Sequence, residues 1–279
     1  MSDIILEHFQ LRRHPYTPEI DLDGLYAFQG FSQGLLRLEQ AIHQRGPVLI
    51  VGDPGAGKTA MVRKFIGRLA PSSFVICAQL VPPGKNSIKS VIEGLLTDLG
   101  ETIPFNNPTQ ALSRLKRCLQ RLYEQGRAVV LIFDDSHHFG PPGWLTLKTL
   151  MNHELDSKMP ALLVFMGARV ETLRTLNLNV LQEVKDRFSF CYHIKGLKGP
   201  EVEKYLETRL QWAGAKHPLF PAGIAEQIGQ HAQWIPRRIN RLAGACLMAA
   251  ATAKRSLIDQ DCLDQAVSEM QFQAQKEAE

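Results

Sequence analysis

The sequence predicts an α/β fold, in which a parallel β-sheet flanked by helices is followed by a small C-terminal lid of helices. Two unbroken apolar runs, residues 128–133 and 161–166, are typical of strands buried on both faces of a parallel sheet. Segments with helical spacing of apolar residues separate the runs and are long enough for βαβ crossovers. After residues 196–200, Gly-Leu-Lys-Gly-Pro, only helical patterns remain. In such sheets ligands bind at the carboxyl ends of the strands, so we expect the functional residues there.

The apolar pattern divides the chain into three expected parts. Residues 1–30 mix aromatic and polar side chains without clean periodicity and predict an ordered arm, residues 31–195 an α/β core, and residues 196–279 a helical lid. We expect strands at 48–51, 74–78, 128–133, 161–166 and 188–194, core helices at 31–43, 87–96 and 107–125, and lid helices near 202–210, 239–250 and 259–270. Gly46 and Pro47 end the first of these helices before the first strand.

Composition and charge exclude several classes of protein. At 279 residues the chain is long enough for one large domain, or a large and a small one. The net charge of +4 permits contact with nucleic acid but does not argue for it. The five cysteines are scattered without a C-x-x-C pair, which favours a reduced compartment over a disulfide framework or a zinc site. The sequence has no apolar run of about 18 residues and no signal-peptide pattern, so we expect a cytoplasmic protein without a membrane partner.

The most specific motif follows the first predicted strand. Residues 52–59 read Gly-Asp-Pro-Gly-Ala-Gly-Lys-Thr, a P-loop pattern set between an apolar strand and a helix. Glycines allow positive φ angles and a close approach of the backbone to a polyphosphate, and the helix that follows offers free N–H groups. Lys58 supplies a charge for the β- and γ-phosphates, and Thr59 offers a hydroxyl to Mg²⁺. The residues expected to hold the nucleotide are Gly52, Asp53, Pro54, Gly55, Ala56, Gly57, Lys58, Thr59 and Ala60.

Two aspartates end the apolar run at residues 128–133. Asp134 is hard to explain as a core residue, because a buried unpaired charge is costly. We expect it to hold Mg²⁺ together with Thr59. Asp135 can orient or deprotonate an attacking water, and the alternative is a helix N-cap or a solvated turn residue. His137 and His138 follow without the cysteine or carboxylate spacing that a zinc site needs.

Three arginines near segment boundaries are candidates for stabilising charge during phosphoryl transfer. Arg187 precedes the fifth predicted strand and could reach the nucleotide of a neighbouring subunit. Arg237 and Arg238 open the long lid helix and could approach the γ-phosphate from the lid. For any single arginine, a surface salt bridge is the alternative.

Together these motifs resemble AAA+ ATPases, and within them the ExeA-like branch that general-secretion A proteins share with transposon ATPases of the TnsC and TniB type. The resemblance covers nearly the whole chain. It rests on residues 9–16 (Phe-Gln-Leu-Arg-Arg-His-Pro-Tyr), the Walker A motif at 52–59, the Walker B motif at 131–137, and the lid stretches 205–214 and 236–240. It implies a Mg²⁺-dependent ATP hydrolase whose arm lies against the adenine. The catalytic residues would be Lys58, Asp134, Asp135, Arg237 as the sensor-2 arginine, and Arg187 as a finger acting on the neighbouring subunit.

Two departures from the family pattern concern the chemistry. Walker B normally ends in Asp-Glu, whereas Asp135 is one methylene shorter, so slow hydrolysis is expected. The predicted strand tip Gly167-Ala168-Arg169 lacks the Asn, Thr or Gln that is usual at the sensor-1 position, and that role stays unassigned. A milder change is Ile235, which stands where the family has a glycine.

Two functions of different class fit this resemblance, and a helicase loader is a third. A regulator of DNA transposition would assemble as a ring or filament on duplex DNA and recruit a transposase or targeting protein. A secretion-assembly ATPase would resemble the general-secretion A proteins, which carry a membrane segment and a peptidoglycan-binding region after the ATPase. Neither pattern follows here, and so we favour transposition. The expected contacts to DNA phosphates are Lys85, Lys89, Lys116, Arg117 and Arg121, with a solvated helix face as the alternative.

Overall fold

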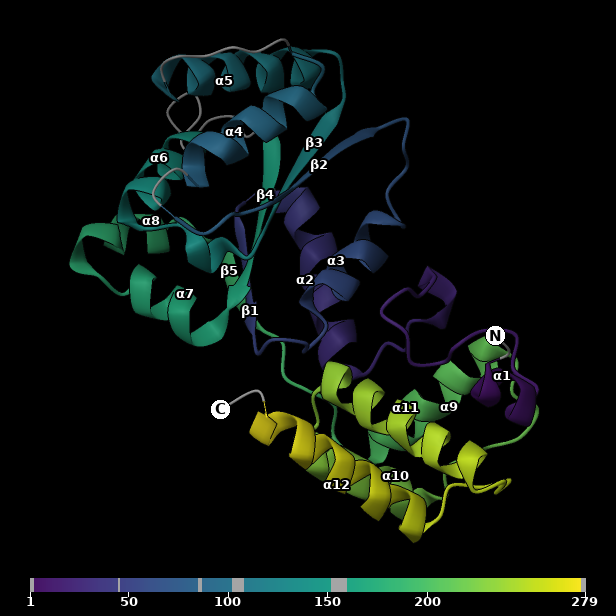
Figure 1. The fold of residues 1–279 in the computed structure, drawn as a ribbon. Helices are drawn as coiled ribbons and strands as arrows, with labels where there is room; N and C mark the ends of the chain where they lie inside the picture. The colour runs from purple at the N-terminus through teal and green to yellow at the C-terminus, as the bar shows by residue number, and fades with distance from the viewer. Residues whose placement is uncertain (1–2, 45, 85–86, 102–107, 152–159, 277–279) are drawn as a thin grey trace. The chain divides into compact units, whose positions relative to one another are not determined.

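The computed structural model describes residues 3–44, 46–84, 87–101, 108–151 and 160–276 (Figure 1). They form two compact units. Unit 1 contains residues 1–32, 55–57 and 195–279, and unit 2 contains residues 33–54 and 58–194. Lys85, one of the expected contacts to DNA phosphates, lies outside the described residues. Among the helices of the described residues, none has the length and apolar content needed to cross a membrane.

Unit 2 is built on a five-stranded parallel sheet, as the sequence predicts. The strands are β1 (Val48–Gly52), β2 (Phe74–Leu80), β3 (Ala128–Asp134), β4 (Ala161–Ala168) and β5 (Phe190–His193), in the order β2-β3-β4-β1-β5. β1, which leads into the P-loop, is an inner strand between β4 and β5 and is buried along its whole length. The register pairs Gly52 with Ala168 and Phe133 with Phe165, so the carboxyl ends of β1, β3 and β4 meet at one edge of the sheet.

Helices cover both faces of this sheet. One face carries α4 (Ser87–Asp98), α5 (Pro108–Glu124), α6 (Pro141–Met151), α7 (Arg169–Leu176) and α8 (Gln182–Lys185), and the other carries α2 (Gln29–Gln44) and α3 (Lys58–Ile66) (Figure 1). Alternate strand residues such as Leu131, Phe133 and Phe165 enter one large apolar cluster with α4 to α8. Phe133 and Phe165 stack with ring centroids 4.7 Å apart, which fixes β3 against β4. The sheet is therefore a rigid base for the loops at its carboxyl edge.

The described residues of unit 1 form helices joined by loops. Its helices are α1 (Ile4–Phe9), α9 (Gly199–Ala213), α10 (Ala222–His231), α11 (Pro236–Thr252) and α12 (Gln260–Lys276), and a short 3₁₀ turn spans Leu22–Gly24. The arm holds a regular helix that the sequence reading missed, capped by the Asp3 carboxylate through hydrogen bonds from the Ile5 and Leu6 amides. Arg209 of α9 is buried and fastens the arm, because it donates to the carbonyls of Pro15 at 2.6 Å and Thr17 at 2.7 Å.

Candidate functional site

The loop after β1 has the backbone that its glycines predict. Gly55 and Gly57 have φ angles of +84° and +102°, in the left-handed region that glycine adopts without strain. Lys58, the first residue of α3, is 9% exposed, and its Nζ donates to the carbonyl oxygens of Gly52 at 2.9 Å and Asp53 at 3.2 Å. The ammonium group is thus held over the first residues of the loop, at the amino end of a helix.

The tip of β3 meets the start of α3. Thr59 Oγ1 donates to Asp134 Oδ2 at 2.8 Å, although the two residues are 75 positions apart in the chain. The second oxygen of Asp134, Oδ1, accepts from the Asp135 amide at 2.9 Å, which fixes the orientation of the carboxylate. The structure therefore brings together the hydroxyl and the carboxylate that the sequence assigns to a single metal site.

Asp135 begins a tight turn. Its backbone is left-handed, with φ +53° and ψ +36°, and it precedes the 3₁₀ turn Ser136–His138. It stands at the N-cap position, but its side chain makes no capping hydrogen bond, so that part of the alternative explanation is not supported. The carboxylate is 44% exposed, with Oδ1 3.8 Å from His137 Nδ1. It therefore faces solvent next to the Thr59–Asp134 pair.

The two histidines after Asp135 have different surroundings. His138 Nδ1 donates to the carbonyl of Val81 at 2.9 Å and so ties the turn to the segment after β2. His137 Nδ1 accepts from the amide of Ala168, at the end of β4, at 3.4 Å. Burial, followed by the neighbouring His138 ring, lowers the pKa of His137 below its ordinary value. His137 is therefore a neutral, largely buried ring between β3 and β4.

Comparisons with known proteins agree with this geometry. Residues 40–176 match the family model of the AAA domain. The general secretion pathway protein A of Aeromonas hydrophila is 26% identical over 249 residues, which are 88% of this chain but only 44% of that relative, so the chain spans less than half of the relative's length.

Solved structures share the fold at low sequence identity. The Aeropyrum pernix ORC2 protein in its ADPNP–ADP complexes superposes with a TM-score of 0.69 at 16% identity, over 92% of this chain and 71% of that one. The A. pernix ORC1 protein in complex with DNA gives 0.68 at 17% identity, over 93% and 69%. The fold is that of an AAA+ P-loop ATPase. The segments that the sequence analysis names Walker A, residues 52–59, and Walker B, residues 131–137, both lie within the matched range.

The two arginines that are predicted to act on a nucleotide, Arg237 and Arg187, lie in different parts of the fold. Arg237 is exposed in the first turn of α11, and its amide donates to the carbonyl of Gly55 at 3.3 Å within unit 1. A Cβ at Gly55 would lie 2.5 Å from the Arg237 Cβ, so only glycine fits there. Arg187 follows α8 and precedes β5. Because Phe190 pairs with Val48, Arg187 lies at the amino edge of the sheet, opposite the carboxyl edge that carries Walker A.

The residues expected to contact DNA differ in whether an acidic side chain pairs with them. On α5, Arg121 Nη2 lies 3.0 Å from Glu101 Oε1, and Arg114 pairs with the same carboxylate. Hydrogen bonds from Cys118 and then from these two arginines lower the pKa of Glu101 to about 2. Its negative charge is thus present at all physiological pH values. The carboxylate of Glu101 therefore neutralises part of the positive charge on the basic face of α5.

The remaining candidates differ in exposure. Lys89 on α4 lies 3.7 Å from the Glu93 carboxylate one turn later. Lys116 is half-buried, and this burial lowers its pKa, whereas Arg117 is exposed. The sequence could not show the pairing of Arg121 because Glu101 lies 20 residues away and precedes α5.

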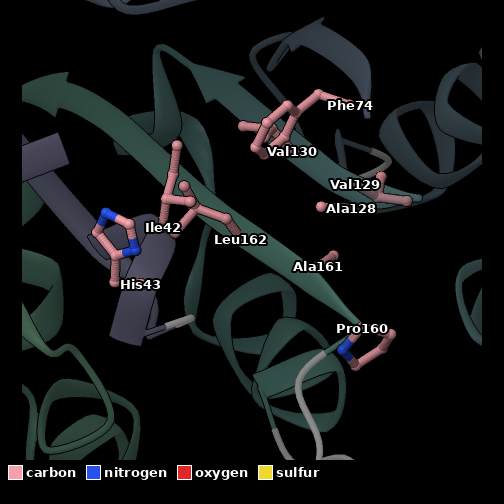
Figure 2. A pocket seen from close by; sticks show the side chains of 9 residues that line it. All are labelled: Ile42, His43, Phe74, Ala128, Val129, Val130, Pro160, Ala161 and Leu162. Atoms are coloured by element: carbon pink, nitrogen blue, oxygen red, sulfur yellow. The ribbon is translucent and has the colours of Figure 1, made fainter. Parts of the chain in front are cut away.

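A separate cavity of about 240 Å³ lies at the amino edge of the same sheet, next to the end of α2 (Figure 2). Its lining is apolar except for one imidazole and consists of Ile42, His43, Phe74, Ala128, Val129, Val130, Pro160, Ala161 and Leu162. This composition has no cation or amide cradle for a phosphate. The cavity is therefore distinct from the Walker site.

Proposed function

We propose that the chain binds ATP with Mg²⁺ at the loop after β1 and hydrolyses it. The observation that carries this proposal is the 2.8 Å hydrogen bond between Thr59 Oγ1 and Asp134 Oδ2, two oxygen donors from distant segments. Hydroxyl and carboxylate oxygens are ligands, direct or through water, that Mg²⁺ prefers. The left-handed glycines and the buried Lys58 supply the complementary phosphate site. The residues present thus fit both groups.

The chain's own residues divide the work. Lys58 and the amides of residues 55–60 hold the phosphates, and Thr59 with Asp134 holds the metal ion, which neutralises phosphate charge when bound. Asp135 orients the attacking water and accepts its proton. Because its carboxylate is one methylene shorter than the usual glutamate, we expect slow turnover. Arg237, whose backbone contacts Gly55, stabilises charge from the lid side.

We further propose that copies of the chain associate into a ring or filament. Arg187 lies at the amino edge of the sheet, away from Walker A of its own unit. An arginine in that place can serve phosphoryl transfer only in another copy. ATP held at one subunit would then strengthen the contact with the next one, since the finger gains an anionic partner.

The arm and lid supply a candidate for the adenine site. Within unit 1, a cavity of about 320 Å³ lies between the arm and α11. Its lining includes His14, Pro15 and Tyr16 of the arm and Asn240 and Gly244 of α11. Asn240 and Gly244 follow Arg237 by about one and two helical turns, on the same face. We therefore place the base in this cavity. A Cβ at Gly244 meets no atom within 4 Å, so Gly244→Leu should fill the cavity and weaken ATP binding without unfolding the lid.

For the biological role we propose a cytoplasmic, DNA-binding regulator of transposition, which assembles on duplex DNA and recruits a transposase or targeting protein. The likeness to an ORC1 protein in complex with DNA supports a DNA partner. The similarity to general secretion pathway protein A supports the alternative, a secretion-assembly ATPase, about as well. A helicase-loader role is the third candidate.

The test is binding of arbitrary duplex DNA in low salt, with a non-hydrolysable ATP analogue, with ADP, and without nucleotide. The transposition proposal expects analogue-dependent, salt-sensitive binding, and rings or filaments on the DNA in electron micrographs. Absence of DNA binding in the presence of bound analogue would remove the DNA role and favour the secretion alternative. Absence of nucleotide binding would remove the ATPase proposal itself.

A further inference from the structure

The tip of β4 cannot carry the usual sensor-1 side chain. A Cβ placed on Gly167 would clash with Thr172 Oγ1 and would lie 3.1 Å from Ser136 Oγ and 3.3 Å from the His137 amide nitrogen. The next residue, Ala168, offers only a methyl group. The β4 tip itself therefore supplies no amide or hydroxyl side chain toward the Walker site.

His137 occupies the place next to this tip. The turn that carries it is fixed to β4, because Ser136 Oγ donates to the Met166 carbonyl at 2.8 Å and is fully buried. The His137 ring then accepts the Ala168 amide at 3.4 Å. Ala168 pairs in register with Gly52, the first Walker A residue. The imidazole is thus held between the ends of β3 and β4. It contacts the β4 residue that pairs with Gly52, the first residue of the P-loop.

The hydrogen bond decides which ring nitrogen carries the proton. Since Nδ1 accepts from an amide, the proton of the neutral ring is on Nε2. Among the described residues, no hydrogen bond from Nε2 is found to another group. The charges that act on the ring include the Lys58 ammonium and the Asp135 carboxylate, so the ring lies within electrostatic reach of both catalytic candidates. The side chain is 19% exposed, which leaves part of the ring open to a ligand.

We propose that His137 takes the role of the missing sensor-1 residue: its Nε2–H is the hydrogen-bond donor that distinguishes ATP from ADP. This inference rests on the proposed nucleotide site and assigns to it a group that reads the γ-phosphate. The neighbouring His138 has no such role, because its Nδ1–H is engaged with the Val81 carbonyl. Arg169, exposed at the start of α7, is the competing candidate.

The test measures affinities for a fluorescent non-hydrolysable ATP analogue and for fluorescent ADP, both with Mg²⁺. His137→Leu should lower analogue affinity roughly tenfold or more, with ADP affinity within about twofold, because a hydrogen bond to a charged group is lost. His137→Gln keeps an acceptor for Ala168 and a donor, and should recover most of the preference for the analogue. His138→Gln should leave the ratio of the two affinities unchanged. Melting temperatures of all variants separate loss of the donor from loss of the fold.

Several outcomes would overturn the assignment. One is an unchanged affinity ratio in a folded His137→Leu variant, another is loss of the ratio in Arg169→Ala, and a third is equal affinity of the wild-type protein for analogue and ADP. These results leave the nucleotide site standing. If the wild-type protein binds neither nucleotide, the proposed function fails first and this inference fails with it.

Discussion

Two regions of unit 2, the carboxyl edge of the sheet and helix α5, carry charged side chains that differ in the groups orienting them. At the carboxyl edge of the sheet, Lys58 and Asp134 are oriented by backbone groups and by a hydroxyl. These contacts hold the ammonium and the carboxylate at the edge of the sheet where the loop after β1 begins. On α5, Arg114 and Arg121 close on the carboxylate of Glu101. The difference teaches that the contacts which orient each charged group indicate a binding site more reliably than a count of charges on a helix face.

The largest expected effect is at the carboxyl edge. Lys58→Ala removes the ammonium that Gly52 and Asp53 hold, and should reduce ATP affinity at least a hundredfold, because phosphate charge in a partly buried site is left unmatched. Equilibrium titration with a fluorescent ATP analogue measures it. Lys64→Ala, on the same helix, is the control and should retain the wild-type affinity. Equal losses in both variants would mean that the loop does not position a specific charge.

A smaller effect concerns the rate. Asp135→Ala should leave ATP affinity unchanged and reduce turnover on the order of a hundredfold, because the group that takes the proton is removed. Asp135→Glu restores the longer reach and should raise turnover severalfold above wild type. Steady-state phosphate release measures both variants. Unchanged turnover in both would show that Asp135 is only a solvated turn residue.

The smallest effects belong to α5 and sharpen the comparison. Arg117→Ala should weaken duplex binding about two- to threefold and reduce the salt slope by about one, as for a single phosphate contact. Arg121→Ala should instead lower the melting temperature, because the largely buried Glu101 carboxylate loses a partner. Fluorescence anisotropy at several salt concentrations and thermal unfolding measure the two effects. If Arg121→Ala reduced DNA affinity as much as Arg117→Ala without a change in stability, the two regions would not differ as described.

The sheet could be predicted from sequence because its strands are buried on both faces. Continuous apolar runs such as 128–133 have no other simple explanation, and all five expected strands are present. The strand, loop and helix around residues 52–59 could be predicted as well, because the glycine spacing and the flanking apolar pattern lie within one short stretch of the chain. The arm helix α1 and the lid helix α10 (Ala222–His231) were missed, because short segments show too few turns for periodicity to register.

Contacts between distant segments could not be read from the chain. His137 meets the Ala168 amide, 31 residues away, only because the register of β3 and β4 places the turn against the end of β4. The sequence did contain a signal, namely the absence of Asn, Thr or Gln at residues 167–169. The sequence alone could not indicate which other residue lies next to the end of β4. The pairing of Arg121 with Glu101 was hidden for the same reason.

The most direct measurement of the central claim is a double-mutant cycle on Thr59 and Asp134. ATP affinity is measured with Mg²⁺ and with a chelator for wild type, Thr59→Val, Asp134→Asn and the double variant. If the two oxygens form one metal site, each single change should reduce the Mg²⁺-dependent gain in affinity by roughly 10- to 100-fold, and the double variant should lose little more. Independent, additive losses, or an undiminished Mg²⁺ dependence in Asp134→Asn, would contradict the account.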